Sequence, residues 1–554
     1  MENHTPSSYA LNPMSPIAES IPPSRPQTGR TSLSSIPSLP DHRLERPLTR
    51  PLSTQSIAQT FTPLHEFLFI ALLCSAQVTT QAALVGPLSI LHILGPALHI
   101  TNPGVLAWLI AGYSLTVGSF ILLSGRMGDV WGYKNMIIFG NVWFGVWSFV
   151  GGVSVWCEGD GKSVLFIFSR VLAGIGPAIL LPNSLGLLGA TYHNGKRKNM
   201  VFSLFGACAP NGAILGAAFA ALWTLVWWPW VFFTFAIAMF CLAGLSVFIL
   251  PSVPVRPEMR NLTLKQKIAE LDLLGATVGI TAMILVNFAI NQAPGFGWHQ
   301  VYIYVILIVG VLLFPAFFYF EMHVAEKPLI TFQALGSDVS FVLGCMACGW
   351  ASFGIFIYYF FQFLELQRGL TPLLTIAQCT PMCVSGALAA ICCGRIIGRV
   401  GPAWVMLISM LAFMTGNLLT ATAPVQQTYW AQIFIAAIVM PWGMDMSFPA
   451  ATLIISDRVK REHQGMGASL VNTVVNYSIS IGVGIAGTVE VHVNNGGKTK
   501  ADELLGYRAA LYMAVGLAGL GVVIALTFVA KGFLRTGEKQ SMDLEDKKAE
   551  DFGI

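Results

Sequence analysis

Long apolar runs alternate with short polar segments over most of this chain. Each run has about 20 residues or more, the length that an α-helix needs to cross a hydrocarbon core of ~30 Å. Lipid offers no partners to backbone N–H and C=O groups, so each run is predicted to be a helix that satisfies its own. We predict fourteen spans, near 66–90, 105–124, 136–155, 164–190, 200–223, 229–250, 272–291, 301–320, 339–362, 373–393, 402–422, 430–455, 466–489 and 508–530.

Composition supports an all-α integral membrane protein. Hydrophobic residues make up 55% of the 554 residues and charged residues only 10%, whereas soluble domains contain ~25% charged residues. A soluble protein with many buried helices is the competing interpretation. The length and number of the apolar runs argue against it.

Lysine and arginine test the number of spans independently. If the chain begins in the cytosol, 25 of the 31 cations fall in cytosolic segments, five fall on the outer side, and Arg170 alone lies within a span. Cytosolic loops of membrane proteins carry this excess of cations. We therefore predict that both termini are cytosolic. The net charge of +4 then marks topology and does not indicate nucleic-acid binding.

Polar segments predict how the chain is divided. The first 64 residues are rich in Ser, Pro, Thr and Arg and are predicted to be disordered. A polar segment between spans 6 and 7 has helical spacing, which favours an amphipathic linker along the membrane surface. The predicted units are a cytosolic tail (1–64), a six-helix bundle (65–250), the linker with two extra spans (251–337), a second six-helix bundle (338–531) and a cytosolic tail (532–554).

The loop after span 2, GRMGDVWGYK at 125–134, is rich in glycine and charge. Asp129 lies where the span ends, and an anion there can face the positive N-terminal end of a neighbouring helix. A plain turn with a charge that marks topology is the alternative. The loop after span 10, GRIIGRVGPAW at 394–404, has a similar pattern. Such a repeat indicates a duplicated six-helix bundle with two inserted helices.

Three motifs resemble signatures of the major facilitator superfamily. They are the loop after span 2 (Gly125, Asp129, Gly132 and Lys134), RVLAGIG in span 4 (Arg170, Gly174 and Gly176) and the antiporter-type motif GACAPNGAILGA in span 5 (Gly206, Pro210, Gly212 and Gly216). The second half is similar to fungal aminotriazole-resistance-type efflux carriers, in the fourteen-span drug:proton antiporter branch. The resemblance implies the major facilitator fold and a loop at 125–134 that latches the two bundles.

The span 5 motif has a physical reading apart from the resemblance. Pro210 removes a helix hydrogen bond. Gly212 and Gly216 lie one turn apart and allow another helix to approach closely. We therefore expect span 5 to be kinked and tightly packed. Its association with antiport is implied only by the resemblance.

Two charged side chains lie well inside predicted spans: Arg170 in the outer third of span 4 and Asp445 near the middle of span 12. Each such charge costs about 2.5–3.5 kcal/mol on insertion scales, which makes it a candidate functional group. Spans 4 and 12 are equivalent helices and should both border a central cavity. Asp445 is predicted to exchange a proton there, with Arg170 as its electrostatic counterpart. A static carboxylate that is hydrogen-bonded to neighbouring helices is the alternative.

Span 1 departs from the pattern of many fourteen-span drug:proton antiporters, which carry an aspartate there. This chain has Gln77 and Gln81 instead, and a neutral amide cannot carry a proton. If protons are coupled, Asp445 must carry more of the coupling, or else Glu490 near the outer end of span 13 or Glu365 near the outer end of span 9. Movement without proton coupling stays open.

Amide side chains are the candidates for lining a substrate cavity, and interhelical packing is the alternative for each. Asn287 and Asn291 share a face of span 7, but we expect that inserted helix at the periphery. The cavity candidates are Gln77, Gln81, Asn183, Asn211, Gln362, Asn472 and Asn476.

These features predict a secondary active transporter that exports small organic compounds, such as drugs or toxic metabolites, by proton antiport with alternating access. An uptake or exchange carrier for a nutrient or inorganic solute (borate, ammonium or a siderophore-type ligand) is one alternative, because the fold is shared. A transceptor or scaffold that transports nothing is the other.

No enzyme is predicted. The phosphate-binding pattern G-x-x-x-x-G-K-[ST] does not occur, so ATP is not an expected partner. We expect no catalytic residue, cofactor, metal or nucleic acid. The expected partners are a small-molecule substrate, protons and the lipid bilayer. The chain is predicted to be a monomer in the plasma membrane, with the vacuolar membrane as the alternative.

Overall fold

The computed structural model describes residue 59 and residues 61–192, 196–253, 262–330, 336–458 and 464–552. Within these ranges all regular secondary structure is helical, and fourteen segments are long and apolar enough to cross a membrane. The predicted all-α class and the fourteen spans are therefore confirmed. The tail predicted at 1–64 lies almost wholly outside the described residues.

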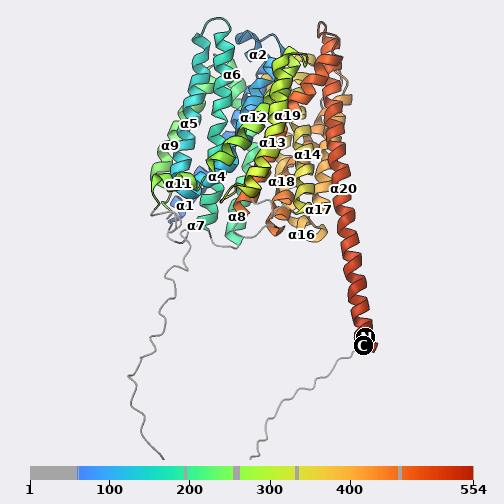
Figure 1. The fold of residues 1–554 in the computed structure, drawn as a ribbon. Coiled ribbons are helices and arrows are strands. Elements are labelled where there is room, and N and C mark those ends of the chain that lie inside the picture. Colours follow the sequence, from blue (N-terminus) through green and yellow to red (C-terminus); the bar gives the residue numbers. More distant parts are fainter. Residues whose placement is uncertain are drawn as a thin grey trace, which may run out of the picture. The chain divides into compact units, whose positions relative to one another are not determined.

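The first six spans come from the first half of the chain (Figure 1). A short helix, α2 (Leu91–Ala97), connects spans 1 and 2. The spans are α1 (Pro63–Leu88), α3 (Pro103–Leu106) with α4 (Trp108–Trp131), α5 (Tyr133–Val153) with η2 (Ser154–Trp156), α6 (Gly161–Ala173) with α7 (Ile175–Thr191), α8 (Lys196–Thr224) and α9 (Trp230–Ile249).

The inserted pair follows a short helix, α11 (Leu264–Ala269), which is the helical part of the predicted linker. Thr263 and Gln266 form a capping box at its start, in which each side chain serves the backbone N–H of the other. Spans 7 and 8 are α12 (Leu273–Phe296) and α13 (Val301–His323).

The last six spans come from the second half. They are α14 (Ser337–Gln362) with the π-helix η4 (Phe363–Gln367), α15 (Pro372–Cys379) with α16 (Pro381–Val400), α17 (Pro402–Thr422), α18 (Gln432–Arg458), α19 (Gln464–Val493) and α20 (Lys500–Phe552). Because α20 continues past span 14 to Phe552, the backbone of the predicted tail 532–554 is helical up to that residue.

The two glycine-rich segments predicted as loops, 125–134 and 394–404, are helical except at one glycine each, because the adjoining helices extend to within one residue of each other. The two single-residue turns have the same backbone geometry. Gly132 separates α4 from α5 with φ of 90°, and Gly401 separates α16 from α17 with φ of 84°. Glycine adopts such positive φ angles without steric cost, so both turns depend on it. The likeness read from the two loop sequences is therefore a likeness of structure.

Helix packing also repeats between the halves. The contacts of α1 with α8, α5 with α9, and α4 with α7 have counterparts in α14 with α19, α17 with α20, and α16 with α18. Two seams join the halves: α4 packs on α19, and α8 packs on α15 and α16. We call the end of the helices that carries Asp129 the Asp129 end and the opposite end, which carries His92, the His92 end.

The inserted helix α12 does not lie at the periphery, and that expectation was wrong. It packs on α4 and α19, the two helices of the first seam, as well as on α13. Asn287 and Asn291 are 0% and 1% exposed. Their polar face is buried against α19, with Ser480 as a hydrogen-bond partner.

Candidate functional site

Asp445 lies midway along α18, beside α16 and near the point where α8 packs on α16 in the second seam. A Cβ built on Gly386 of α16 would lie 2.5 Å from Oδ2 of Asp445 and 3.4 Å from Cγ of Pro210 in α8. Glycine at position 386 therefore leaves the space that the carboxylate occupies. The structure brings Asp445 close to Pro210 of the span 5 motif, a neighbourhood that the sequence did not reveal.

The carboxylate of Asp445 lacks a fixed partner on one side. Its Oδ2 atom is buried, and no described protein group donates a hydrogen bond to it. Most buried polar atoms in native structures are hydrogen-bonded, so this carboxylate oxygen is a candidate site for a proton, a water molecule or a ligand.

Residues around Asp445 fix the helices that carry it. Ser385 Oγ donates to Ile438 O at 2.5 Å and accepts from Trp442 Nε1 at 3.1 Å, which joins α16 to α18. The Cys383 thiol lies 3.7 Å from Pro210 O and reaches from α16 to α8. Movement of α8 relative to α16 would therefore change the surroundings of Asp445.

Arg170 is buried among groups of the first half. Its Nε donates to Leu109 O at 3.3 Å and a terminal nitrogen donates to Ala83 O at 2.6 Å. Its guanidinium lies 4.7 Å from the ring centre of Tyr113, whose hydroxyl donates to Thr80 O at 2.9 Å. Arg170 thus joins α6 to α1 and α4. None of these contacts reaches Asp445.

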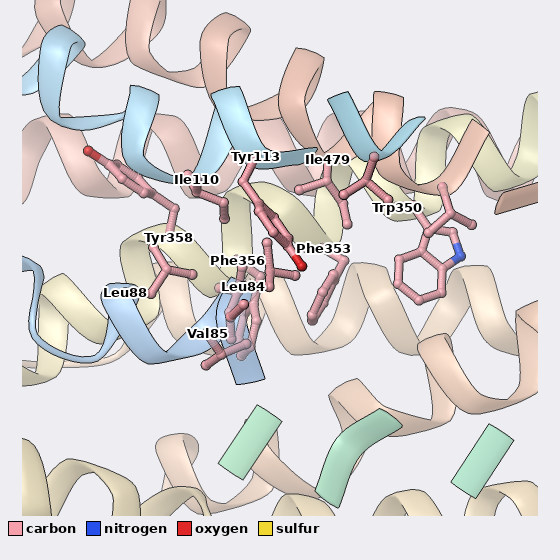
Figure 2. Packing of buried hydrophobic residues seen from close by; sticks show 14 of the residues in the cluster. Leu84, Val85, Leu88, Ile110, Tyr113, Trp350, Phe353, Phe356, Tyr358 and Ile479 are labelled. Atoms are coloured by element: carbon pink, nitrogen blue, oxygen red, sulfur yellow. The ribbon is translucent and has the colours of Figure 1, made fainter. Parts of the chain in front are cut away.

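The ring of Tyr113, which the Arg170 guanidinium contacts, belongs to a buried apolar cluster that includes residues of both halves. Figure 2 shows side chains from α1 and α4 beside side chains from α14 and α19. Such packing excludes water from the contact between the halves. The labelled members are Leu84, Val85, Leu88, Ile110, Tyr113, Trp350, Phe353, Phe356, Tyr358 and Ile479.

The segment 125–134, at the junction of α4 and α5, contacts the second half at the first seam. A Cβ on Gly125 would lie 3.3 Å from Ser469 Oγ in α19. The Tyr133 hydroxyl donates to Asp129 Oδ1 at 2.5 Å across the turn that Gly132 makes. Lys134 Nζ donates to two carbonyls at the C-terminal end of α9, both at 2.8 Å. These carbonyls have no partner within their own helix, so Lys134 caps α9.

Arg126, near the C-terminal end of α4, links this segment to the inserted spans. Its guanidinium donates to Lys327 O at 2.7 Å, to Glu270 O at 3.4 Å and to Pro328 O. These carbonyls flank α12 and α13. Because the partners lie 144 to 202 residues away along the chain, no local pattern could have shown this contact.

Close packing of span 5 is confirmed. A Cβ on Gly212 would lie 2.6 Å from Val78 Cα, and a Cβ on Gly216 would lie 2.6 Å from Ala82 Cβ. The two glycines therefore let α8 approach α1 nearly to backbone contact. Gly206 has no such neighbour within 4 Å.

The amide candidates fall into two groups. Asn183 and Gln362 are buried in helix contacts: Asn183 Nδ2 donates to Ser124 O at 3.2 Å, and Gln362 Oε1 accepts from the Tyr507 hydroxyl at 3.2 Å. The others keep solvent-accessible or half-buried polar surface. These are Gln77 and Gln81 on α1, Asn211 on α8, and Asn472 and Asn476 on α19.

Two further carboxylates are buried at the His92 end. Glu365 in η4 lies 2.7 Å from His92 Nδ1, and Glu490 in α19 accepts from the Tyr359 hydroxyl at 2.7 Å. Both acids are 6% exposed. The sequence pointed to the two acids but not to His92 or Tyr359, because these partners come from distant helices. π-Helical turns such as η4 are frequent at functional sites.

Fourteen spans in two halves with repeated packing, and a buried acid where the halves meet, define a multi-pass membrane carrier. The chain matches the Major Facilitator Superfamily over residues 67–386 and 339–549. It belongs to this superfamily.

Fungal relatives are similar over most of the chain. The chain is 49% identical over 479 residues to the low affinity ammonium transporter of Saccharomyces cerevisiae, covering 86% of this chain and 91% of the relative. It is 41% identical over 493 residues to the efflux pump terG of Aspergillus terreus, covering 89% and 92%. It is 38% identical over 477 residues to the aminotriazole resistance protein of S. cerevisiae, covering 85% of each. The resemblance stated from the second half is therefore confirmed.

Proposed function

We propose that this protein exports small organic compounds in exchange for protons by alternating access. The observation that carries the proposal is the buried Oδ2 of Asp445, which has no partner among the described protein groups and lies beside α16, near the point where α8 packs on α16. A relative that is an efflux pump supports the direction of transport. The single chain is proposed to act as a monomer in the plasma membrane, with both termini in the cytosol.

Asp445 can couple proton movement to helix movement because of its position. When α8 packs on α16, the carboxylate is shielded from water, and an ionised carboxylate is costly to shield. When the second seam opens, water reaches Asp445 and solvates the ionised carboxylate, which stabilises the charged form. In the proposed cycle Asp445 takes up a proton while it is open to the outer side and releases it while it is open to the cytosol, where arriving substrate favours the release.

The other predicted residues take supporting roles in this scheme. Gly125, which packs on Ser469 of α19, and the nearby Asp129 turn are proposed to act as the latch at the first seam. Gly212 and Gly216 keep α8 and α1 moving together, because their backbones are nearly in contact. Arg170 holds α1, α4 and α6 as one body through backbone carbonyls. The half-buried amides on α1, α8 and α19 are the proposed substrate contacts.

Exchange of ammonium is a second candidate. The relative with 49% identity is a low affinity ammonium transporter. Asp445 has no salt bridge to a Lys, Arg or His among the described residues, so a small cation could neutralise it in place of a proton. Both candidates use the same acid and differ in the substrate and in the direction of net movement.

Transport in cells with and without the gene separates the candidates. An efflux carrier lowers the accumulation of labelled organic compounds, and collapse of the proton gradient abolishes the difference. An ammonium carrier instead raises uptake of labelled methylammonium, used as the ammonium probe. If neither probe moves differently in cells that contain the protein, the proposal of transport is wrong for both classes.

A further inference from the structure

Three helices meet at one buried hydroxyl, and one of them is the inserted helix α12. Ser480 in α19 is 0% exposed. Its Oγ lies 2.8 Å from Ala111 O in α4 and 2.8 Å from Asn287 Oδ1 in α12. Asn291 Nδ2 adds a bond of 3.2 Å to Ser480 O. The junction therefore joins both helices of the first seam to α12.

Further bonds fasten α12 on both sides of the seam. Toward α19, the Tyr477 hydroxyl donates to Met283 O at 3.0 Å. Toward the first half, Trp108 Nε1 donates to Gln292 Oε1 at 3.1 Å and Asn102 Nδ2 donates to Gly295 O at 2.7 Å. The helix is thus bonded to both halves between the middle of the seam and the His92 end.

The single proton of the Ser480 hydroxyl faces two acceptors, Ala111 O and Asn287 Oδ1. A hydroxyl that loses its only acceptor inside a membrane is left unsatisfied, which is costly. Here the hydroxyl keeps Asn287 when α4 moves away from α19. The two helices of the seam can therefore separate while the Ser480 hydroxyl keeps an acceptor. The bonds from Trp108 and Asn102 to α12 oppose this separation.

We propose that α12 is a strap across the α4–α19 seam that holds the protein closed at the His92 end. The bonds of Asn291, Asn287 and Tyr477 fasten the strap to the second half, and those of Asn102 and Trp108 fasten it to the first. The inserted helix then sets the balance between the closed and open forms of this end. Its meaning for transport rests on the proposed alternating access, but its effect on the seam does not.

Distances between spin labels test the strap without any substrate. Asp160 in the first half and Gln426 in the second are exposed at the His92 end and can be changed to cysteine for labelling in the full chain, after replacement of the ten native cysteines. In Asn287→Ala/Asn291→Ala, the population with a longer label-to-label distance should grow relative to the parent. Each interhelical hydrogen bond lost should raise the open-to-closed ratio roughly threefold.

Two further variants make the outcome decisive. Thr277→Ala removes a polar side chain from an exposed face of α12 that bonds only within its own helix, and it should leave the distances unchanged. Tyr477→Phe removes one hydroxyl and should shift the same population by a smaller amount, which provides the test if the double variant does not fold. If Tyr477→Phe and every folded asparagine variant give the same label-to-label distances as the parent, the strap proposal is overturned. A shift without measurable transport of any probe would support the strap and reject only the proposed function.

Discussion

His92 Nδ1 lies 2.7 Å from Glu365 Oε2, and this pair joins the first half to the second half at the His92 end. The two residues are 273 positions apart. The Glu365 side chain is 2% exposed and the His92 side chain 25%. A charged or hydrogen-bonded pair of this kind, buried on one side, is a specific link between two bodies that must separate for this end to open.

Glu365→Gln and His92→Ala should each reduce the stability of the closed form at this end, because the first removes the negative charge of the pair and the second removes the imidazole. We expect the rate of transport to fall severalfold in each single variant, with the double variant no worse than the more damaged single one. Transport rates in the four-member cycle measure this coupling. Glu158→Gln, at an exposed position of the same end, is the control. Additive losses in the double variant would show that the two residues act separately.

Asp445→Asn should abolish export driven by a pH gradient while substrate exchange across the membrane continues. An amide has the size of the carboxylate but cannot exchange a proton at physiological pH. Uptake into inside-out vesicles, with and without an imposed pH gradient, separates these two activities. Asp160→Asn removes a carboxylate from an exposed position and should behave as the parent. If Asp445→Asn vesicles still concentrate substrate at the parent rate, the coupling group lies elsewhere.

Gly386→Ala should impair transport through Asp445 without touching the acid itself. The added Cβ would lie 2.5 Å from Asp445 Oδ2, so the carboxylate must move. We expect a loss of at least tenfold in gradient-driven export, as for misplacement of a functional group by about 1 Å. Gly394→Ala on the same helix has nothing within 4 Å of its added Cβ and serves as the matched control. Equal activity in the two variants would separate Gly386 from the function of Asp445.

The sequence predicts those features of the fold and the candidate site that depend on local residue patterns, and it does not predict those that depend on contacts between distant helices. Span number and helical class follow from the length of apolar runs, and the depth of Asp445 follows from its place in such a run. The sequence does not predict which neighbours a helix face packs against, because an asparagine buried between helices and one at the periphery look alike in sequence. Asn287 and Asn291 were misplaced for that reason. Gly386, His92 and Arg126 were missed because their partners are brought near only by the packing of distant helices.

Gly212→Ala should destabilise the protein, whereas Gly206→Ala should not, although both glycines belong to the span 5 motif. A Cβ at 212 would lie 2.6 Å from Val78 Cα, and backbone cannot yield as a flexible side chain can. The helices α8 and α1 must then move apart, at a cost of about 1–3 kcal/mol, typical of overpacking. At 206 the added methyl group meets nothing within 4 Å, and alanine favours the helix by roughly 1 kcal/mol over glycine.

Thermal unfolding of the purified protein in detergent, followed by size-exclusion chromatography, should give a lower midpoint for Gly212→Ala and an unchanged or higher one for Gly206→Ala. The same loss in both variants would mean that the motif acts through backbone flexibility of α8 and not through its contact with α1.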